Sequence, residues 1–312
     1  MYIPQLARMA TGMLKRFGGD VSPCNNHTEP TMMKPVKSSV FTSALIASLL
    51  GTAASMAGDA TTTTTTTVAP APAEDKFSGT LTLDMNSHFI SYGLDVWGDG
   101  NDWNGGTFNP ALELTWALPG NFTAILGTWW DVNGKVPSAI GGKLQEIDIW
   151  AGLGYKIGDL SITGLYQNWN YASGNEQIVD IKFAYDCFLS PSLTIHNRVD
   201  PGASGGNNGT VLVAGISHSV EAGPVTFSFP FNIAYFVDDD FHPASTDSGF
   251  GYGSLGVNAT YALDFLGEDY GKWNVHAGVT YYVTDGDVVA NSDSGRPDND
   301  FLTGTIGIGC AF

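Results

Sequence analysis

Apolar residues recur at every second position along residues 79–312, in segments of about 9–13 residues. In residues 225–237 the odd positions carry Val, Phe, Phe, Phe, Ile, Tyr and Val, and the even positions include Thr226, Ser228 and Asn232. This period places apolar side chains on one face of a strand and polar ones on the other. The strands of a soluble β-sandwich also alternate, but they are usually shorter and less aromatic. The pattern therefore predicts tilted membrane strands, with one face toward lipid and one toward water.

The alternation and the turn residues together predict twelve strands. Their expected ranges are 79–89, 107–118, 122–132, 144–157, 160–170, 178–188, 193–199, 210–220, 225–237, 252–265, 273–284 and 301–312. Tight connections such as 119–121 and 158–159 alternate with long ones such as 92–106 and 285–300. We expect an all-β fold, a closed antiparallel transmembrane β-barrel of about 12 strands. An even number of strands and short periplasmic turns place both termini in the periplasm.

The composition agrees with a chain that exposes an apolar outer surface. Charged residues make up 14% of the sequence, whereas soluble proteins carry about 25%. Aromatic residues reach 12%, and there are 39 glycines. The formal net charge of −18 would repel phosphates, so no nucleic-acid partner is expected.

The amino-terminal region reads as an export signal. Lys34 and Lys37 precede an apolar stretch over residues 40–56, and Ala57 completes a small-x-small cleavage site. We expect residues 1–57 to hold an amino-terminal extension and a Sec-type signal peptide. Residues 58–78, with seven threonines at 61–67, are predicted to be a Thr/Pro-rich periplasmic spacer before the barrel at 79–312. The expected location is the bacterial outer membrane.

The last strand carries an expected insertion signal. Ile306, Ile308 and Phe312 alternate with small or polar residues and end the chain on an aromatic side chain. We expect the barrel-assembly machinery to read this strand, and outer-membrane lipid and lipopolysaccharide to surround the finished barrel. Cys187 and Cys310 fall on predicted strands without metal-ligand spacing, so they are interpreted as small lipid-facing residues.

Residues 146–166 (EIDIWAGLGYKIGDLSITGLY) combine an acidic-x-Asp-x-aromatic strand, a Gly-Asp-Leu-Ser turn and a return strand that contains Tyr166. This segment resembles the TorF family of porins, and the likeness extends more loosely over residues 79–312. The family often carries an Arg-Gly pair near the end of its first strand, whereas residues 87–93 contain no arginine. The resemblance implies an outer-membrane barrel and, less directly, passive transport.

The alternation also assigns charged side chains to the barrel interior, because a basic residue facing lipid at mid-bilayer costs about 2–4 kcal/mol. The predicted pore-lining residues are Glu113, Glu146, Asp148, Lys156, Asp180, Lys182, Asp186, His196, Arg198, Asp264 and His276. Two interpretations remain open: a hydrated interior of mutually paired charges, or an acidic constriction that favours cations. We predict passive diffusion of small polar or cationic solutes, with no catalysis and no cofactor.

Two other functions are compatible with a barrel. One is a structural or adhesive barrel without transport. The other is an outer-membrane phospholipase, for which Ser217-His218 and His196-Asn197-Arg198 are the candidates, although adjacent residues of a strand point to opposite faces. No metal site is expected, but acidic loops supply candidate calcium ligands at Asp99, Asp102, Asp238, Asp239 and Asp240.

Overall fold

The computed structural model describes residues 76–312, except residues 173, 203, 294–295 and 298. The expected extension and signal peptide, and nearly all of the expected spacer, lie outside the described residues. In the described part of the chain, no helix is long and apolar enough to span a membrane.

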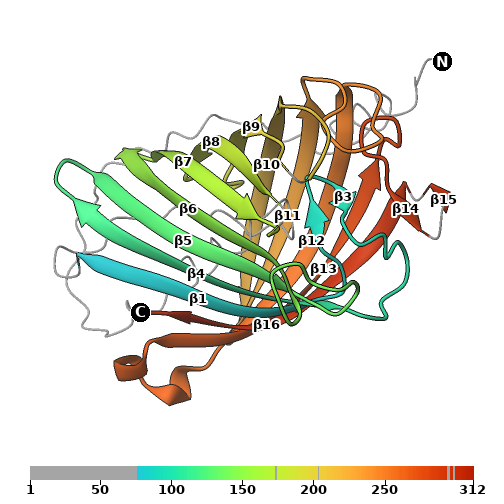
Figure 1. The fold of residues 1–312 in the computed structure, drawn as a ribbon. Coiled ribbons are helices and arrows are strands. Elements are labelled where there is room, and N and C mark those ends of the chain that lie inside the picture. The colour runs from blue at the N-terminus through green and yellow to red at the C-terminus, as the bar shows by residue number, and fades with distance from the viewer. Residues whose placement is uncertain (1–75, 173, 203, 294–295, 298) are drawn as a thin grey trace, which may run out of the picture. The chain divides into compact units, whose positions relative to one another are not determined.

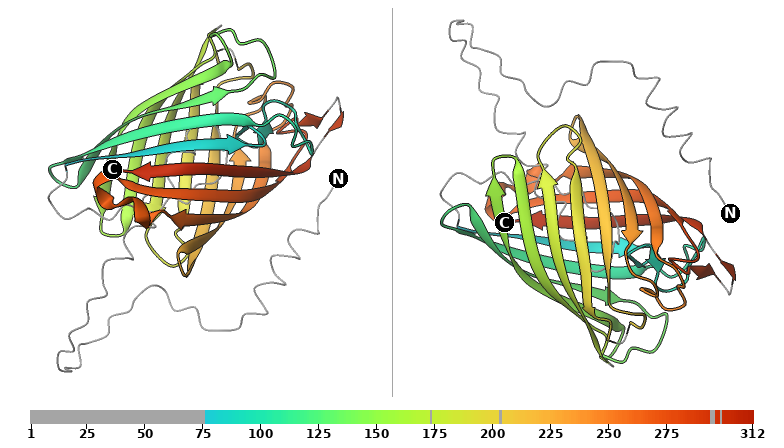
Figure 2. Two further views of the ribbon diagram at one scale, coloured as in Figure 1. Left: turned by 90° about the horizontal axis from the view of Figure 1, so that it is seen from below. Right: turned by 90° about the horizontal axis from the view of Figure 1, so that it is seen from above.

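The described residues form a closed antiparallel barrel of twelve strands (Figure 1). Its strands are β1 (Phe77–Asn86), β4 (Thr107–Leu118), β5 (Phe122–Val132), β6 (Leu144–Ile157), β7 (Leu160–Asn170), β8 (Asn175–Tyr185), β9 (Ser192–Asp200), β10 (Gly209–Ala222), β11 (Val225–Phe236), β12 (Gly249–Ala262), β13 (Lys272–Thr284) and β16 (Asp300–Ala311). Each strand pairs with the next one along the chain, and β16 pairs with β1 to close the barrel. Figure 2 shows the red β16 beside the blue β1.

Smaller elements lie in the connections. Two short hairpins are formed by β2 (Ile90–Ser91) with β3 (Leu94–Asp95), and by β14 (Ser292–Asp293) with β15 (Arg296–Pro297). Two 3-10 turns, η1 (Asp264–Leu266) and η2 (Glu268–Tyr270), connect β12 to β13. Apart from this connection, the turns at that end of the barrel are short, and we call it the short-turn end; the opposite end is the long-loop end.

The predicted strand number and antiparallel closure are confirmed, and the ranges 107–118, 122–132, 144–157 and 160–170 match β4 to β7 at both ends. Other boundaries were wrong by a few residues. The first strand begins at Phe77, inside the expected spacer. β8 ends at Tyr185 and β12 at Ala262, three residues before the predicted ends, because apolar residues in the following turns continue the alternation.

The two faces of the wall differ as the period-two pattern requires. On β11, Phe229, Phe231 and Ile233 are exposed on the outer face, whereas Asn232 and Ala234 are buried on the inner face. An outer surface of exposed apolar side chains is stable only against lipid, because in water it would cost about 25 cal/mol per Å². The strands therefore have the surface of transmembrane strands.

The closing seam brings the last residue against the first strand. The backbone N–H of Phe312 donates to the carbonyl of Gly79 (3.0 Å), and the N–H of Gly79 donates back to Phe312 (2.8 Å). A Cβ on Gly79 would lie 2.5 Å from the Phe312 ring, so a glycine at this position lets the ring lie against the first strand. Ile306, Ile308 and Phe312 are all exposed on the outer face, where the insertion signal was expected.

The lipid-facing interpretation of both cysteines was wrong in part. Cys187 lies in the turn after β8, not on a strand. Cys310 is on β16 but only 5% exposed. Its sulfur lies against the backbone of Gly271, where an added Cβ would be 2.8 Å away, and Trp273 is its partner in the neighbouring strand. The chain segment that enters β13 therefore covers Cys310.

Candidate functional site

The structure places nine of the eleven predicted lining residues on the inner face of the barrel. These nine are Glu113, Glu146, Asp148, Lys156, Asp180, Lys182, His196, Arg198 and His276. Asp186 and Asp264 were assigned wrongly: both are exposed at the short-turn end, Asp186 after β8 and Asp264 in η1. Both errors have the same cause: the alternation predicted that β8 and β12 continue beyond their true ends, and these two carboxylates lie in the wrongly predicted extensions.

The connection between β1 and β4, residues 87–106, enters the barrel, and we call it the inner loop. Figure 1 shows its β2–β3 hairpin at the end of the barrel opposite to Phe312. The hairpin turns at Tyr92 (φ 47°) and Gly93 (φ 79°), and a Cβ on Gly93 would lie 2.5 Å from the Tyr252 ring. Asn291 fixes the hairpin: its Nδ2 donates to the Gly93 carbonyl (2.8 Å), and its Oδ1 accepts from the Asp95 N–H (2.6 Å).

Apolar side chains surround the inner loop on both sides. On one side Phe89 belongs to a buried cluster whose other members are Ala111, Trp129, Trp150 and Leu165, from β4 to β7. On the other side Ile90 and Tyr92 belong to a second buried cluster, with Trp169, Ile178, Val211, Ala234, Phe236, Phe241, Tyr252, Tyr282, Val288, Val289 and Phe301. Because these clusters draw on strands around the barrel and on two further loops, the lumen is packed at the level of the inner loop.

Trp150 shows how the sequence makes room for this packing. Its side chain is fully buried, and its Nε1 donates to Glu113 Oε2 (3.0 Å). The indole lies across Gly127 on the neighbouring strand, where a Cβ would approach it to 2.1 Å. A glycine at this position of β5 therefore lets a large ring lie flat against the wall.

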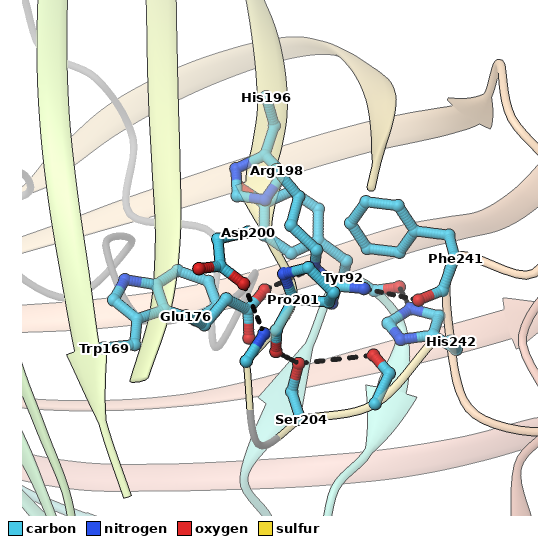
Figure 3. A network of polar contacts seen from close by, with 12 residues as sticks. Tyr92, Trp169, Glu176, His196, Arg198, Asp200, Pro201, Ser204, Phe241 and His242 are labelled. Carbon is cyan, nitrogen blue, oxygen red and sulfur yellow. Dashed lines mark hydrogen bonds and ion pairs between the residues drawn. The ribbon is translucent and has the colours of Figure 1, made fainter. Parts of the chain in front are cut away.

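A polar network ties the inner loop to the wall (Figure 3). The hydroxyl of Tyr92 contacts Nδ1 of His196, and the two ring centroids are 3.8 Å apart. Nδ1 of His196 also lies 2.8 Å from Asp180 Oδ1, while Asp180 Oδ2 accepts from Gln167 Nε2 at 2.7 Å. Buried polar groups of this kind need partners, so the network fixes the position of Tyr92.

Arg198, two residues after His196 on β9, holds a second set of polar contacts beside this network. Its Nε donates to Glu176 Oε1 (2.5 Å), its Nη1 donates to the Phe241 carbonyl, and its guanidinium lies 3.8 Å above the Phe241 ring. The Tyr171 hydroxyl donates to Glu176 Oε2 (3.1 Å). Burial, followed by the charges of Glu146 and Glu176, raises the pKa of Tyr171 well above its ordinary value, so Tyr171 remains a donor.

His242, in the loop between β11 and β12, completes the packing. Its Nε2 donates to the Tyr92 carbonyl (3.2 Å), and its ring packs against Phe236 and Phe241. Burial, and then the charge of Arg198, lowers the pKa of His242 from 6.5 to about 3. The loop therefore docks with a neutral imidazole.

We expect this docking to weaken with acid. The folded pKa of His242 is depressed, so as the pH falls below about 6.5 the undocked loop binds a proton that the docked loop excludes. The stability of docking should decrease progressively between pH 6.5 and about 3. Arg198 and His196, which face His242, oppose its protonation as well. Hydrogen exchange of residues 238–246 at pH 7 and pH 4 measures how much the docking of the loop weakens. His242→Gln should abolish the part of this pH dependence that is due to His242. An equal pH dependence in the variant and in the unmodified protein would contradict the prediction.

The inner face toward the short-turn end is more accessible. It carries small polar residues such as Thr123, Thr163, Thr194 and Thr260, which are half-buried. Lys156, Lys182 and His276 lie in the same part of the wall and are also half-buried. The packed, carboxylate-rich region is therefore confined to the half of the lumen near the long loops.

The acidic loops do not assemble a metal site. Asp99 pairs with the Lys135 ammonium, Asp102 accepts from the Asn104 N–H (2.8 Å), and Asp238 accepts from the Thr210 N–H (2.7 Å). Asp239 and Asp240 are exposed in the same loop as His242. Within residues 76–312, as far as they are described, no group of three His, Cys, Asp or Glu side chains could hold a metal ion.

The phospholipase candidates lie on opposite faces of their strands. Ser217 is buried on the inner face of β10, whereas the ring of His218 packs on Phe188, with the centroids 4.2 Å apart. His196 is buried inside and Asn197 is exposed outside. Ser217 therefore cannot pass a proton to His218, and Asn197 cannot hydrogen-bond to the His196 ring to orient it.

Several residues of this site were missed by the sequence reasoning. Trp150 and Trp169 lie two positions after the inward-facing Asp148 and Gln167, so the alternation could have predicted that both indoles face the lumen. Tyr92, Phe241 and His242 lie in loops, where no periodicity indicates direction. Their role depends on contacts with distant strands.

No known protein family and no curated protein matches the chain. Solved structures similar to it include a KdgM porin in complex with disordered oligogalacturonate (12% identity, 75% of this chain and 99% of that chain, TM-score 0.42). Another is the translocator domain of the autotransporter NalP from Neisseria meningitidis (12% identity, 77% of this chain and 89% of that chain, TM-score 0.39). A third is an anion-selective porin from Comamonas acidovorans (9% identity, 76% of this chain and 98% of that chain, TM-score 0.33). The resemblance to the TorF family stays a prediction.

The class of the chain follows from its own strands. Only helices and closed barrels satisfy every backbone polar group in lipid. A closed antiparallel barrel with an apolar outer face and a polar inner face is a transmembrane β-barrel.

Proposed function

We propose that the chain is a bacterial outer-membrane channel for passive diffusion of small polar or cationic solutes, closed near its long loops by the inner loop. The observation that carries the proposal is the content of the lumen. Ionisable side chains, among them the nine predicted ones, line the inner face, and the obstruction is a connecting loop held by hydrogen bonds such as those of Asn291. A loop can move while the barrel wall remains intact.

The proposal includes the orientation and processing of the protein. Export with a signal peptide cleaved after Ala57 would leave both termini in the periplasm and the long loops outside. Insertion would use the barrel-assembly machinery and the exposed apolar residues of β16. The finished barrel would contact lipopolysaccharide around its long loops, and it would need neither catalysis nor a cofactor.

A structural or adhesive barrel without transport is the second candidate, and the packed long-loop half of the lumen favours it. Single-channel recording in planar bilayers separates the two. The channel proposal expects discrete conductance steps, with reversal potentials in a salt gradient shifted toward cation preference by the carboxylates of the long-loop half. Silence across many insertions, both in this protein and in a variant with a shortened inner loop, would leave the structural barrel as the function.

A further inference from the structure

The inner wall carries a row in which carboxylates and indoles alternate. In the strand register Trp129 of β5 is opposite Asp148 of β6, Asp148 is opposite Trp169 of β7, and Trp169 is opposite Glu176 of β8. Opposite residues of antiparallel strands project to the same face, with their Cβ atoms about 4.5–5.5 Å apart. Asp148 therefore stands between two tryptophans on the wall of the lumen.

Asp148 is also the carboxylate with the least satisfied environment. Its side chain is fully buried, and its carboxylate oxygens have no partner other than the carboxyl of the neighbouring Glu146, with which a hydrogen bond forms only if the two groups share a proton. Nearby carboxylates are satisfied: Asp131 accepts from Trp97 Nε1 (3.0 Å) and Asn133 Nδ2 (2.8 Å), and Glu176 is paired with Arg198. A shared proton satisfies this hydrogen bond but leaves the Glu146–Asp148 pair with one buried negative charge, and such a charge is costly without a cation.

The surroundings select the kind of cation. A divalent metal ion such as Ca²⁺ requires about six or more oxygen ligands, and the described residues offer no group of three ligating side chains. An indole face beside a carboxylate favours an organic ammonium ion, because the ring attracts the positive charge while its surface contacts the attached methyl or methylene groups.

We propose that the row Trp129–Asp148–Trp169, together with Glu146, is a binding site for an organic ammonium ion. The proposal rests on the proposed channel function and names a solute class for it. The inner loop covers this row: the Phe89 ring lies 5.0 Å from that of Trp129, and the Tyr92 ring stacks on Trp169 at 6.4 Å. The ammonium ion therefore competes with the inner loop for the indole faces, so its binding is coupled to displacement of that loop.

Isothermal titration calorimetry on the full chain, refolded in detergent, tests the site with choline as the probe. Its neutral isostere 3,3-dimethylbutan-1-ol is the ligand control. Choline should bind saturably and the isostere should not. Asp148→Asn should weaken choline binding about tenfold or more, because it removes the paired charge. Asp264→Asn removes a carboxylate that is exposed at the short-turn end and should bind choline as the unmodified chain does.

A second variant tests the competition with the inner loop. Phe89→Ala uncovers Trp129 and should increase the affinity for choline. The proposal is overturned if choline does not bind saturably, which is the result expected if a proton shared by Glu146 and Asp148 takes the place of a cation. It is also overturned if the Asp148→Asn protein binds choline with unchanged affinity. Binding in detergent is independent of conductance. Binding with silent bilayers would reject only the channel, and conductance without binding would reject only the ammonium site.

Discussion

Replacing residues 88–105 of the inner loop by a short Gly-Ser linker is expected to increase single-channel conductance roughly two- to fivefold, because the open cross-section limits ion flow. The deletion removes Phe89, Ile90 and Tyr92 from the two apolar clusters that fill the lumen. It leaves the strands of the barrel and their pairing intact. Conductance in planar bilayers is the measurement.

The matched control shortens residues 137–142, which belong to a mostly exposed loop between β5 and β6, and should leave conductance near its original value. Should the long deletion fail to fold, Tyr92→Gly tests the same point. Glycine accepts the positive φ of this position, and the change removes the ring that contacts His196. Unchanged conductance in a correctly folded Tyr92→Gly protein and in the deletion would show that the inner loop does not limit flow.

Arg198→Leu is expected to reduce the free energy of unfolding by about 3–5 kcal/mol, because it leaves a buried carboxylate without its charge partner. Both side chains of the Arg198–Glu176 pair are almost fully buried. The change also removes the hydrogen bond to the Phe241 carbonyl and the contact with the Phe241 ring. Denaturant unfolding in lipid vesicles gives the difference.

The partner change separates charge from packing. Arg198→Leu combined with Glu176→Gln removes the unpaired charge and should recover a large part of the lost stability. Lys143→Met removes a basic residue from an exposed loop and should change stability by less than about 0.5 kcal/mol. If the double variant is as unstable as Arg198→Leu alone, lost packing rather than the unpaired carboxylate is the cause.

Much of the barrel could be predicted from the sequence because membrane strands are specified locally. A shift of one residue would move every side chain to the other face, so the contrast between lipid and water fixes the parity of each strand. This reasoning located β4 to β7 at both ends and placed Asp148, Asp180 and Arg198 on the inner face. It failed at Asp186 and Asp264, because apolar residues in two turns extend the alternation beyond the end of the wall.

The closure of the lumen was decided by the tertiary structure alone. Tyr92 meets His196 across 104 positions of the chain, and Asp95 meets Asn291 across 196. No local period relates such pairs, since a loop has no regular direction and its path depends on which inner side chains leave room for it. The amino-acid sequence by itself therefore determined that the protein is a barrel, how many strands it has and which face of each strand is turned inward. Only the tertiary structure decided that a loop enters the barrel and covers a row of carboxylates and indoles.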